Sequence, residues 1–351
     1  MSENLSRRKF VLFAFMSTML SVTVLAAAAL SFDVYLHKRF EGKQGLNVWG
    51  YRGPVAGRKH PGEVRILMLG GSTAFGYGVP PEKTIPAYLE RKLNDRRAAE
   101  HLGPIAVVNL GFNNEGAYSF KFTLQDYEYL DYDVVILYEG YNDLGGGPNL
   151  AVFRHASPVF RLTGYFPLFP MIAREKTMSL TYGGDLEAAY REEKTTFRPN
   201  LADRATASAL EAALSVGDVL ARQIDRFAEE APHAGSVATG AGCGPPWTHY
   251  CGAVAEAVEW ATASGRRVLI VTQPYVSERH INQQQALATM IDQRWHGHRL
   301  ISHVNAGNSV DLSNRRIAYD GVHLIAEGNE RVAEDLVQPT IELLRSTTAA
   351  R

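Results

Sequence analysis

A serine that stands among glycines after an apolar run is the first residue whose surroundings suggest chemistry. Ser72 lies in the stretch Gly70-Gly71-Ser72-Thr73, where the glycines allow the backbone to bend sharply and expose the hydroxyl. A serine hydroxyl is a weak nucleophile until a base accepts its proton. His323 is a candidate base, and Asp320, three residues earlier, can hold the imidazole in one tautomer. The three side chains together could attack an acyl carbonyl.

Such an attack also needs N–H donors for the negative oxygen that forms on the carbonyl. The stretch Glu139-Gly140-Tyr141-Asn142-Asp143 offers the side-chain amide of Asn142, and the loop after Asn109 is rich in glycine. The backbone amide of Ser72, one beside a loop glycine and the Asn142 amide could together bind an oxyanion. Preorganised donors of this kind typically contribute about 10²–10³-fold each in rate.

The elements before these residues read as strands of a buried parallel sheet. Short apolar runs rich in Val, Ile and Leu end directly before each polar stretch, and helical patterns lie between them. Strands that alternate with helices predict a parallel sheet covered on both faces, with the ligand site at the carboxyl edge. The strands are expected at 64–69, 105–110, 133–138, 267–272 and, more weakly, near 303–312, and the helices at 81–97, around 253–264 and from 324 toward 344.

The order of these blocks resembles the SGNH hydrolases, also called the GDSL esterase/lipase family. The resemblance covers roughly residues 62–143 and 266–345. Gly70-Gly71-Ser72 corresponds to the nucleophile block, with Gly71 where the commoner pattern has Asp. Gly140-Tyr141-Asn142-Asp143 matches the Gly-x-Asn-Asp block, and Asp320 with His323 matches the last block.

The resemblance implies a three-layer α/β/α, flavodoxin-like fold and a set of site residues. The catalytic triad would be Ser72, Asp320 and His323, and the oxyanion hole would be formed by Ser72, Gly116 and Asn142. In the glycine block, Gly116, followed by Ala117-Tyr118-Ser119, fits the family position better than Gly111. The implied activity is that of a serine esterase or lipase-type hydrolase that needs no metal or organic cofactor.

Other functions remain compatible with the sequence. A sugar hydroxyl in place of water would make the protein an O-acyltransferase, and a deacetylase of an extracytoplasmic polysaccharide is a related alternative. A catalytically silent binding module in a surface-polymer assembly is a third hypothesis. The substrate is thus expected to be a small-molecule or polysaccharide ester. No Gly-Lys-Ser/Thr phosphate loop and no Gly-x-Ser-x-Gly nucleophile elbow fits here.

The N-terminus carries an uncharged, largely apolar run from Phe10 to Phe32, preceded by Arg7, Arg8 and Lys9. A helix of this length can cross a hydrocarbon core of about 30 Å, and the basic flank should stay cytoplasmic. We expect a single-pass membrane protein with its catalytic domain outside the cytoplasm, on the periplasmic side. Secretion after signal cleavage near residues 26–29 is the alternative, and residues 6–10 also resemble a twin-arginine export signal.

The expected organisation is a cytoplasmic tail at 1–9, a signal anchor at 10–32, a linker or N-terminal extension at 33–61 and a hydrolase domain at 62–345. An insertion at about 144–246 interrupts the strand alternation and includes a helical pattern at 204–230. It could be a lid or substrate-binding cap, or an inert elaboration at the sheet edge.

Composition excludes several classes of protein. Apolar residues are 46%, charged residues are 21% and the net charge is -1, which is ordinary for globular proteins and gives no sign of a nucleic-acid partner. Cys243 and Cys251 could form a surface disulfide outside the cytoplasm or remain free thiols. The pair His296 and His298 reads as a solvated loop rather than a metal site.

Two further motifs could act near the site. Arg52, before the first strand, could meet an anionic substrate group or form a surface salt bridge. The residues Gln273-Pro274-Tyr275 follow the fourth strand and could shape the substrate pocket, although core packing of Tyr275 is an equal alternative.

Overall fold

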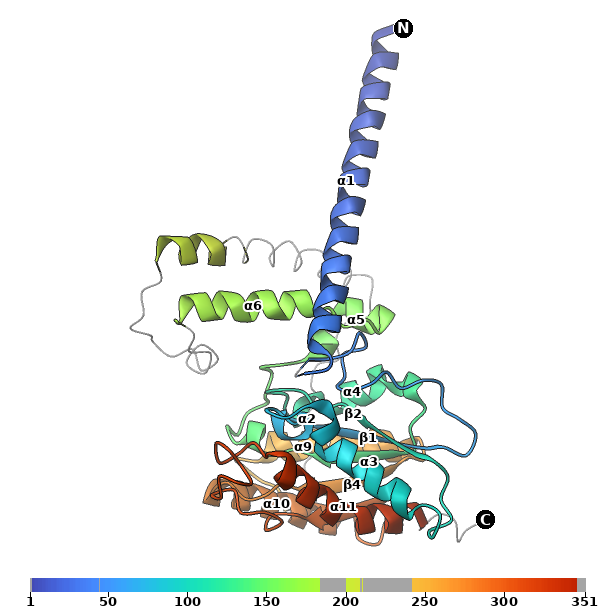
Figure 1. Cartoon of the computed structure of the whole chain (residues 1–351), viewed down its shortest axis with the longest axis vertical. Coiled ribbons are helices and arrows are strands. Elements are labelled where there is room, and N and C mark those ends of the chain that lie inside the picture. Colours follow the sequence, from blue (N-terminus) through green and yellow to red (C-terminus); the bar gives the residue numbers. More distant parts are fainter. Residues whose placement is uncertain (1, 44, 184–199, 209, 211–241, 346–351) are drawn as a thin grey trace.

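A central sheet of five parallel strands organises the structure, a computed structural model that describes residues 2–43, 45–183, 200–208, 210 and 242–345 (Figure 1). Its strand order is β2-β1-β3-β4-β5, the doubly wound order of flavodoxin-like folds. The predicted α/β class and parallel sheet are therefore confirmed. The strands are β1 (Val64–Gly70), β2 (Ile105–Asn109), β3 (Val134–Tyr138), β4 (Arg267–Thr272) and β5 (Ile301–Asn305).

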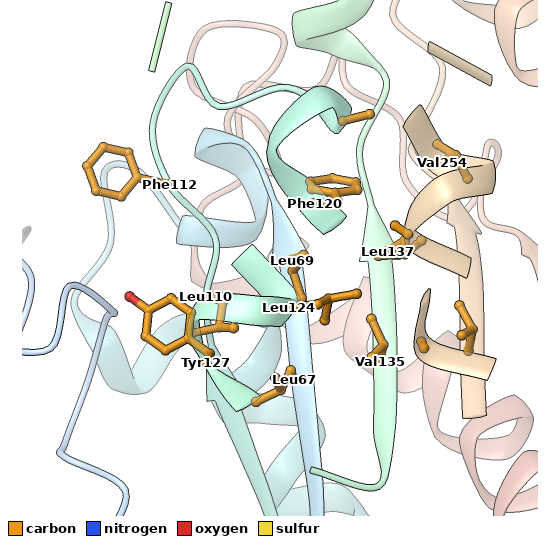
Figure 2. Packing of buried hydrophobic residues seen from close by; sticks show 14 of the residues in the cluster. Leu67, Leu69, Leu110, Phe112, Phe120, Leu124, Tyr127, Val135, Leu137 and Val254 are labelled. Carbon is orange, nitrogen blue, oxygen red and sulfur yellow. The ribbon is translucent and has the colours of Figure 1, made fainter. Parts of the chain in front are cut away.

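Helices cover both faces of the sheet, because successive strand side chains point to opposite sides. On one face, Ile66 and Met68 of β1 share a buried cluster with residues of α3 (Ile85–Arg96) and α11 (Ala326–Arg345). On the other face, Leu67 and Leu69 pack with α4 (Phe120–Asp126) and α9 (Thr248–Ala263). Figure 2 shows this second cluster between β1, β3 and the covering helices.

Several predicted bounds shift in the structure. The helix expected at 81–97 is a short 3₁₀ turn, Pro81–Lys83, followed by α3, which Thr84 caps at Ala87 N. The fifth strand lies at Ile301–Asn305, earlier than predicted, because its residues are only partly buried at the sheet edge and give a weak apolar signal. Helix α10 (Glu278–Trp295) was not predicted, because its many polar residues dilute its periodicity.

The N-terminal helix α1 (Ser2–Phe40) is longer than the predicted anchor. Its stretch Arg8–Phe40 is apolar and long enough to cross a membrane, and its most apolar window is not buried by the rest of the chain. Figure 1 shows it projecting from the domain. The helix continues past residue 32, into the range expected to be a linker, and ends against the domain.

The insertion begins with short helical turns and two helices, α5 (Pro158–Thr163) and α6 (Leu168–Thr181). Residues 201–208 and 210 are also helical, while the remainder of the predicted helix at 204–230 lies outside the described residues. At the end of the insertion, Cys243 and Cys251 form a disulfide, one of the two outcomes the sequence allowed. The expected surface position is wrong, because both cysteines are buried in the cluster that α9 shares with β3 and β4.

Candidate active site

Ser72 lies at the start of the short helix α2 (Ser72–Phe75), directly after β1. The turn is held by hydrogen bonds from Phe75 N to Gly71 O and from Gly76 N to Ser72 O, 3.0 and 2.9 Å long. A Cβ added at Gly70 would overlap the carbonyl oxygen of Tyr138, so only glycine allows β1 to turn this closely past β3. The sharp turn sets Ser72 at the carboxyl edge of the sheet.

The loop before α11 brings a base to this serine. The Oγ of Ser72 lies 2.8 Å from Nε2 of His323, and Nδ1 of His323 lies 2.6 Å from a carboxylate oxygen of Asp320. Partial burial alone would raise the pKa of Asp320, but hydrogen bonds from the His323 side chain and from backbone N–H groups lower it below its ordinary value. The carboxylate therefore stays ionised beside the imidazole, as a base-orienting group requires.

Two tyrosines that the sequence reading missed flank the imidazole. The Tyr319 ring stacks on His323 with centroids 5.9 Å apart, and the Tyr77 ring lies 5.1 Å away at a tilt. Both tyrosines remain partly exposed, so they lie beside the imidazole at the surface rather than in the core. Their positions could have been suspected, because Tyr319 directly precedes Asp320 and Tyr77 lies between Gly76 and Gly78.

The predicted oxyanion donors come from two neighbouring loops. Asn142 lies in a 3₁₀ turn after β3, and its Nδ2 donates one hydrogen bond to Glu115 O, 3.0 Å away, which leaves a second N–H. A Cβ on Gly71 would overlap Asn142 Nδ2, so this amide lies beside the serine turn. Among the described residues, the backbone N–H groups of Ser72 and Gly116 have no acceptor, so both can donate to a substrate oxygen.

Gly111, the weaker alternative for the glycine of the oxyanion hole, has a structural role instead. Its N–H donates to Asn109 Oδ1 at 3.0 Å, so it is not free to bind an oxyanion. A Cβ there would lie 2.8 Å from the backbone carbon of Ala74, so Gly111 allows its loop to approach α2.

The Gly116 loop is fixed by residues at the start of the insertion, a role that the sequence did not reveal. Arg154 and Glu115 form a fully buried, bidentate ion pair with N–O distances of 3.1 and 2.7 Å, and Arg154 also donates to Leu110 O. Asn149 donates to the carbonyl oxygens of Asn114 and Asn142 at 3.1 and 3.0 Å. These contacts hold the Gly116 and Asn142 loops together, as preorganised donors require.

A buried carboxyl group lies against the serine turn, in the space beside Gly71. Glu139 Oε1 accepts hydrogen bonds from the N–H groups of Gly140 and Asn142 at 2.9 and 3.1 Å. A Cβ added at Gly71 would lie 2.6 Å from Glu139 Oε2, so this carboxyl fills the space that a side chain at 71 would need. Glu139 is therefore a positioning residue for Asn142.

Burial raises the pKa values of Glu139 and its neighbour Asp143, and the negative charge of Asp143 raises the pKa of Glu139 further. A carboxyl whose pKa rises on folding favours folding most below its ordinary pKa, which is 4.5 for Glu139, and loses that contribution as pH rises through the folded value.

We therefore expect a Glu139→Gln variant to lose stability less steeply than the wild type as pH rises from about 4.5 into the alkaline range. Thermal unfolding of both proteins between pH 5 and 9 measures this. Parallel stability curves would show that Glu139 does not titrate with a raised pKa.

Arg52 does neither of the things expected from the sequence. Its side chain is buried, and it donates to the carbonyl oxygens of Phe75 at the end of α2, of Gly76 and Val79 in the loop that follows, and of Lys43. Burial lowers its pKa to about 10. The predicted substrate contact or surface salt bridge is wrong, because the guanidinium satisfies the carbonyl groups that a tight turn leaves unpaired.

Replacement of Arg52 by Met should leave these carbonyl groups without partners. Each buried polar group left unpaired costs about 1–3 kcal/mol, so we expect a loss of unfolding free energy of about 3 kcal/mol or more. Urea unfolding of the detergent-solubilised chain measures this loss. Arg58→Met, at an exposed arginine of the same segment, is the control and should change stability little. Equal stability of the two variants would contradict the role of Arg52.

The segment after β4 both supports the site and borders a groove. Gln273 is fully buried and joins two loops, since its amide donates to Thr73 Oγ1 at 2.8 Å and accepts from Tyr141 N at 3.1 Å. Tyr275 lines an open groove of about 540 Å³ with Asp311, Ser313 and Gly321 among others. Because Gly321 directly follows Asp320, the groove reaches the backbone next to that residue of the candidate triad.

The described residues contain no cluster of three His, Cys, Asp or Glu side chains that could hold a metal ion. His296 is exposed and pairs with Asp292 at 2.9 Å, within the same stretch of helix and turn.

No family model and no curated protein matches the chain. Similar solved structures include a family 3 carbohydrate esterase from Clostridium thermocellum, with 12% identity, TM-score 0.43 and coverage of 81% of this chain and 98% of that one. An acetyl xylan esterase from Geobacillus stearothermophilus has 13% identity, TM-score 0.41 and coverages of 80% and 94%. A lipase/acylhydrolase from Enterococcus faecalis has 13% identity and a TM-score of 0.37, and the match covers 79% of this chain and 95% of that one. At these values the similarities assign no activity to this chain.

Proposed function

We propose that this protein is a serine ester hydrolase of the SGNH type. Ser72 is the nucleophile, His323 is the base, and Asp320 is the carboxylate that orients His323. The observation that carries the proposal is the continuous hydrogen-bonded series from Ser72 Oγ to His323 to Asp320, with distances of 2.8 and 2.6 Å. The serine follows β1 and the other two residues precede α11, so the series joins the two ends of the domain's sequence.

The geometry supports a two-step acyl transfer. Ser72 Oγ attacks the ester carbonyl carbon while its proton passes to Nε2 of His323, and the ionised Asp320 stabilises the imidazolium. The N–H groups of Ser72, Gly116 and Asn142 would receive the carbonyl oxygen as it becomes negative. His323 then returns the proton to the departing alcohol, and water, deprotonated by His323, releases the acid from Ser72.

The proposed substrates are acyl esters of small molecules or of polysaccharides. The groove next to Asp320 supports both substrate classes, because it is open and combines the aromatic ring of Tyr275 with polar groups of Asp311 and Ser313. An open, mixed surface suits a polar alcohol group better than a long acyl chain, which an apolar pocket would bind.

We also propose that α1 anchors the protein in the cytoplasmic membrane with the hydrolase domain outside. The helix is long and apolar enough to cross a bilayer, and Arg7, Arg8 and Lys9 precede its uncharged run.

Labelling of the full chain with a fluorophosphonate tests the central claim. An activated serine should give one adduct, which peptide mapping should locate at Ser72, and Ser72→Ala should abolish it. The absence of an adduct on the folded wild type would overturn the assignment of Ser72 as an activated nucleophile.

A further inference from the structure

The membrane helix joins the domain through buried contacts instead of a flexible tether. Helix α1 runs without a break to Phe40, and its side chains at Asp33, Leu36 and His37 are at most 7% exposed. A helix whose last turns are buried in a domain must move with that domain. The orientation of α1 therefore fixes the orientation of the hydrolase domain.

Hydrogen bonds tie these turns to the segment between α5 and α6. The Asp33 carboxylate accepts from the backbone N–H groups of Leu168 and Phe169 at 3.2 and 2.5 Å, at the N-terminus of α6, and from the Tyr165 hydroxyl. The two ring nitrogens of His37 lie 2.9 and 2.8 Å from the carbonyl oxygens of Leu46 and Phe166. An acidic group at a helix N-terminus is favourable, so Asp33 also stabilises α6 where it meets α1.

The same contacts set the level of α5 and α6 along α1. Phe32 is the last residue of the uncharged run, and its ring meets that of Phe169 with centroids 6.0 Å apart. Figure 1 shows α5 and α6 beside the end of α1, both lying across its axis. The start of α6 therefore lies level with the point where the membrane-spanning part of α1 ends.

Side chains at this level are of the kinds found where membranes meet water. Tyr35 is 50% exposed and accepts a hydrogen bond from the guanidinium of Arg39, and Lys38 is exposed beside it. On α5, Leu162 is 66% exposed although it is apolar. Aromatic and basic residues are enriched at membrane–water interfaces, and basic side chains attract anionic lipid headgroups.

We propose that α5 and the first turn of α6 rest in the headgroup layer of the bilayer that α1 crosses, so that the domain is held against the lipid in one orientation. The inference rests on the proposed membrane anchoring and is independent of the proposed catalysis. The partner is the phospholipid surface itself. It follows that the active site is held close to the membrane surface, no farther away than the height of the domain, and that substrates must reach it there.

Single-cysteine labelling of the full chain in vesicles tests this contact. The chain has two cysteines and both are in the disulfide, so an introduced thiol is labelled alone. A fluorophore on Leu162→Cys or Pro170→Cys should be quenched several-fold more by phosphatidylcholine–phosphatidylglycerol vesicles carrying headgroup-level spin labels than one on Asp335→Cys. Position 335 is exposed on α11, which Figure 1 places at the far end of the domain from α1. Equal quenching at the three positions would overturn the proposal.

A second variant tests whether the buried contacts impose the orientation. Alanine at both Asp33 and His37 preserves helix propensity but removes the bonds to the insertion, so the quenching difference between Pro170→Cys and Asp335→Cys should disappear. Lys38→Ala, in the same turn but exposed, should retain it. An unchanged difference in the double variant would refute the rigid coupling. Fluorophosphonate labelling of Ser72 in the same vesicles reports separately on the proposed catalysis.

Discussion

Ser72→Ala is expected to lower kcat/KM for ester hydrolysis by about 10⁴–10⁶-fold, the range seen when the nucleophile of a serine triad is removed. The loss follows from the geometry, because no covalent acyl intermediate can form without Oγ, although the oxyanion donors remain. Hydrolysis of a short acyl ester by purified full-length protein measures it. The fold should survive, since the Ser72 Oγ bonds only to His323 among the described residues.

Ser264→Ala is the matched control for this experiment. Ser264 is exposed at the end of α9, where the chain enters the amino end of β4, so it lies at the sheet edge opposite the site. Its loss should leave hydrolysis unchanged. Turnover retained by Ser72→Ala above that of a His323→Ala variant would contradict the assignment of Ser72 as nucleophile.

The second large effect is expected at Gly71, where neighbouring side chains already fill the space that a side chain would need. Gly71→Asp should lower kcat/KM by about 10²-fold or more, because even the Cβ would overlap Asn142 Nδ2 and press on the Glu139 carboxyl. The added carboxylate would also lie beside a buried acid. Steady-state kinetics and thermal unfolding of the same preparation separate lost activity from lost stability. Gly57→Ala is the control, since nothing lies within 4 Å of its Cβ position.

A double variant sharpens this test. Because the Glu139 carboxyl fills the space beside Gly71, Glu139→Ala should make room for the new side chain in the Gly71→Asp background. We expect the double variant to recover part of the activity lost by Gly71→Asp alone, so that the two effects are not additive. Strict additivity would indicate that the two side chains do not compete for one site.

Local patterns in the sequence sufficed for the strands β1 to β4 and for the polar residues at the ends of three of them. The runs that become β1, β3 and β4 are short, apolar and rich in branched residues, because a parallel strand is buried on both faces. The order of the strands was implied only in outline by the alternation with helices. The edge strand β5 and the polar helix α10 gave weak patterns, since half-exposed elements carry less apolar signal.

In the candidate site, too, some features could be predicted from the sequence and others could not. The sequence by itself singled out Ser72, Asn142, Asp320 and His323, because reactive side chains beside glycines, after a strand or before a helix, form short, local motifs. What only the tertiary structure decided is how these residues are supported. Arg52 binds three carbonyl groups of the serine loop, and Glu139 fills the space beside Gly71.

Such supporting contacts leave no local pattern, because their partners are backbone groups brought together by folding. The same reason applies to α1. Its apolar run predicted a membrane helix, whereas its rigid attachment through Asp33 and His37 depends on backbone atoms more than 120 residues away in the chain. The neighbours of a reactive side chain in the sequence can indicate its role. A buried hydrogen bond to a distant backbone group, in contrast, forms only when the chain folds.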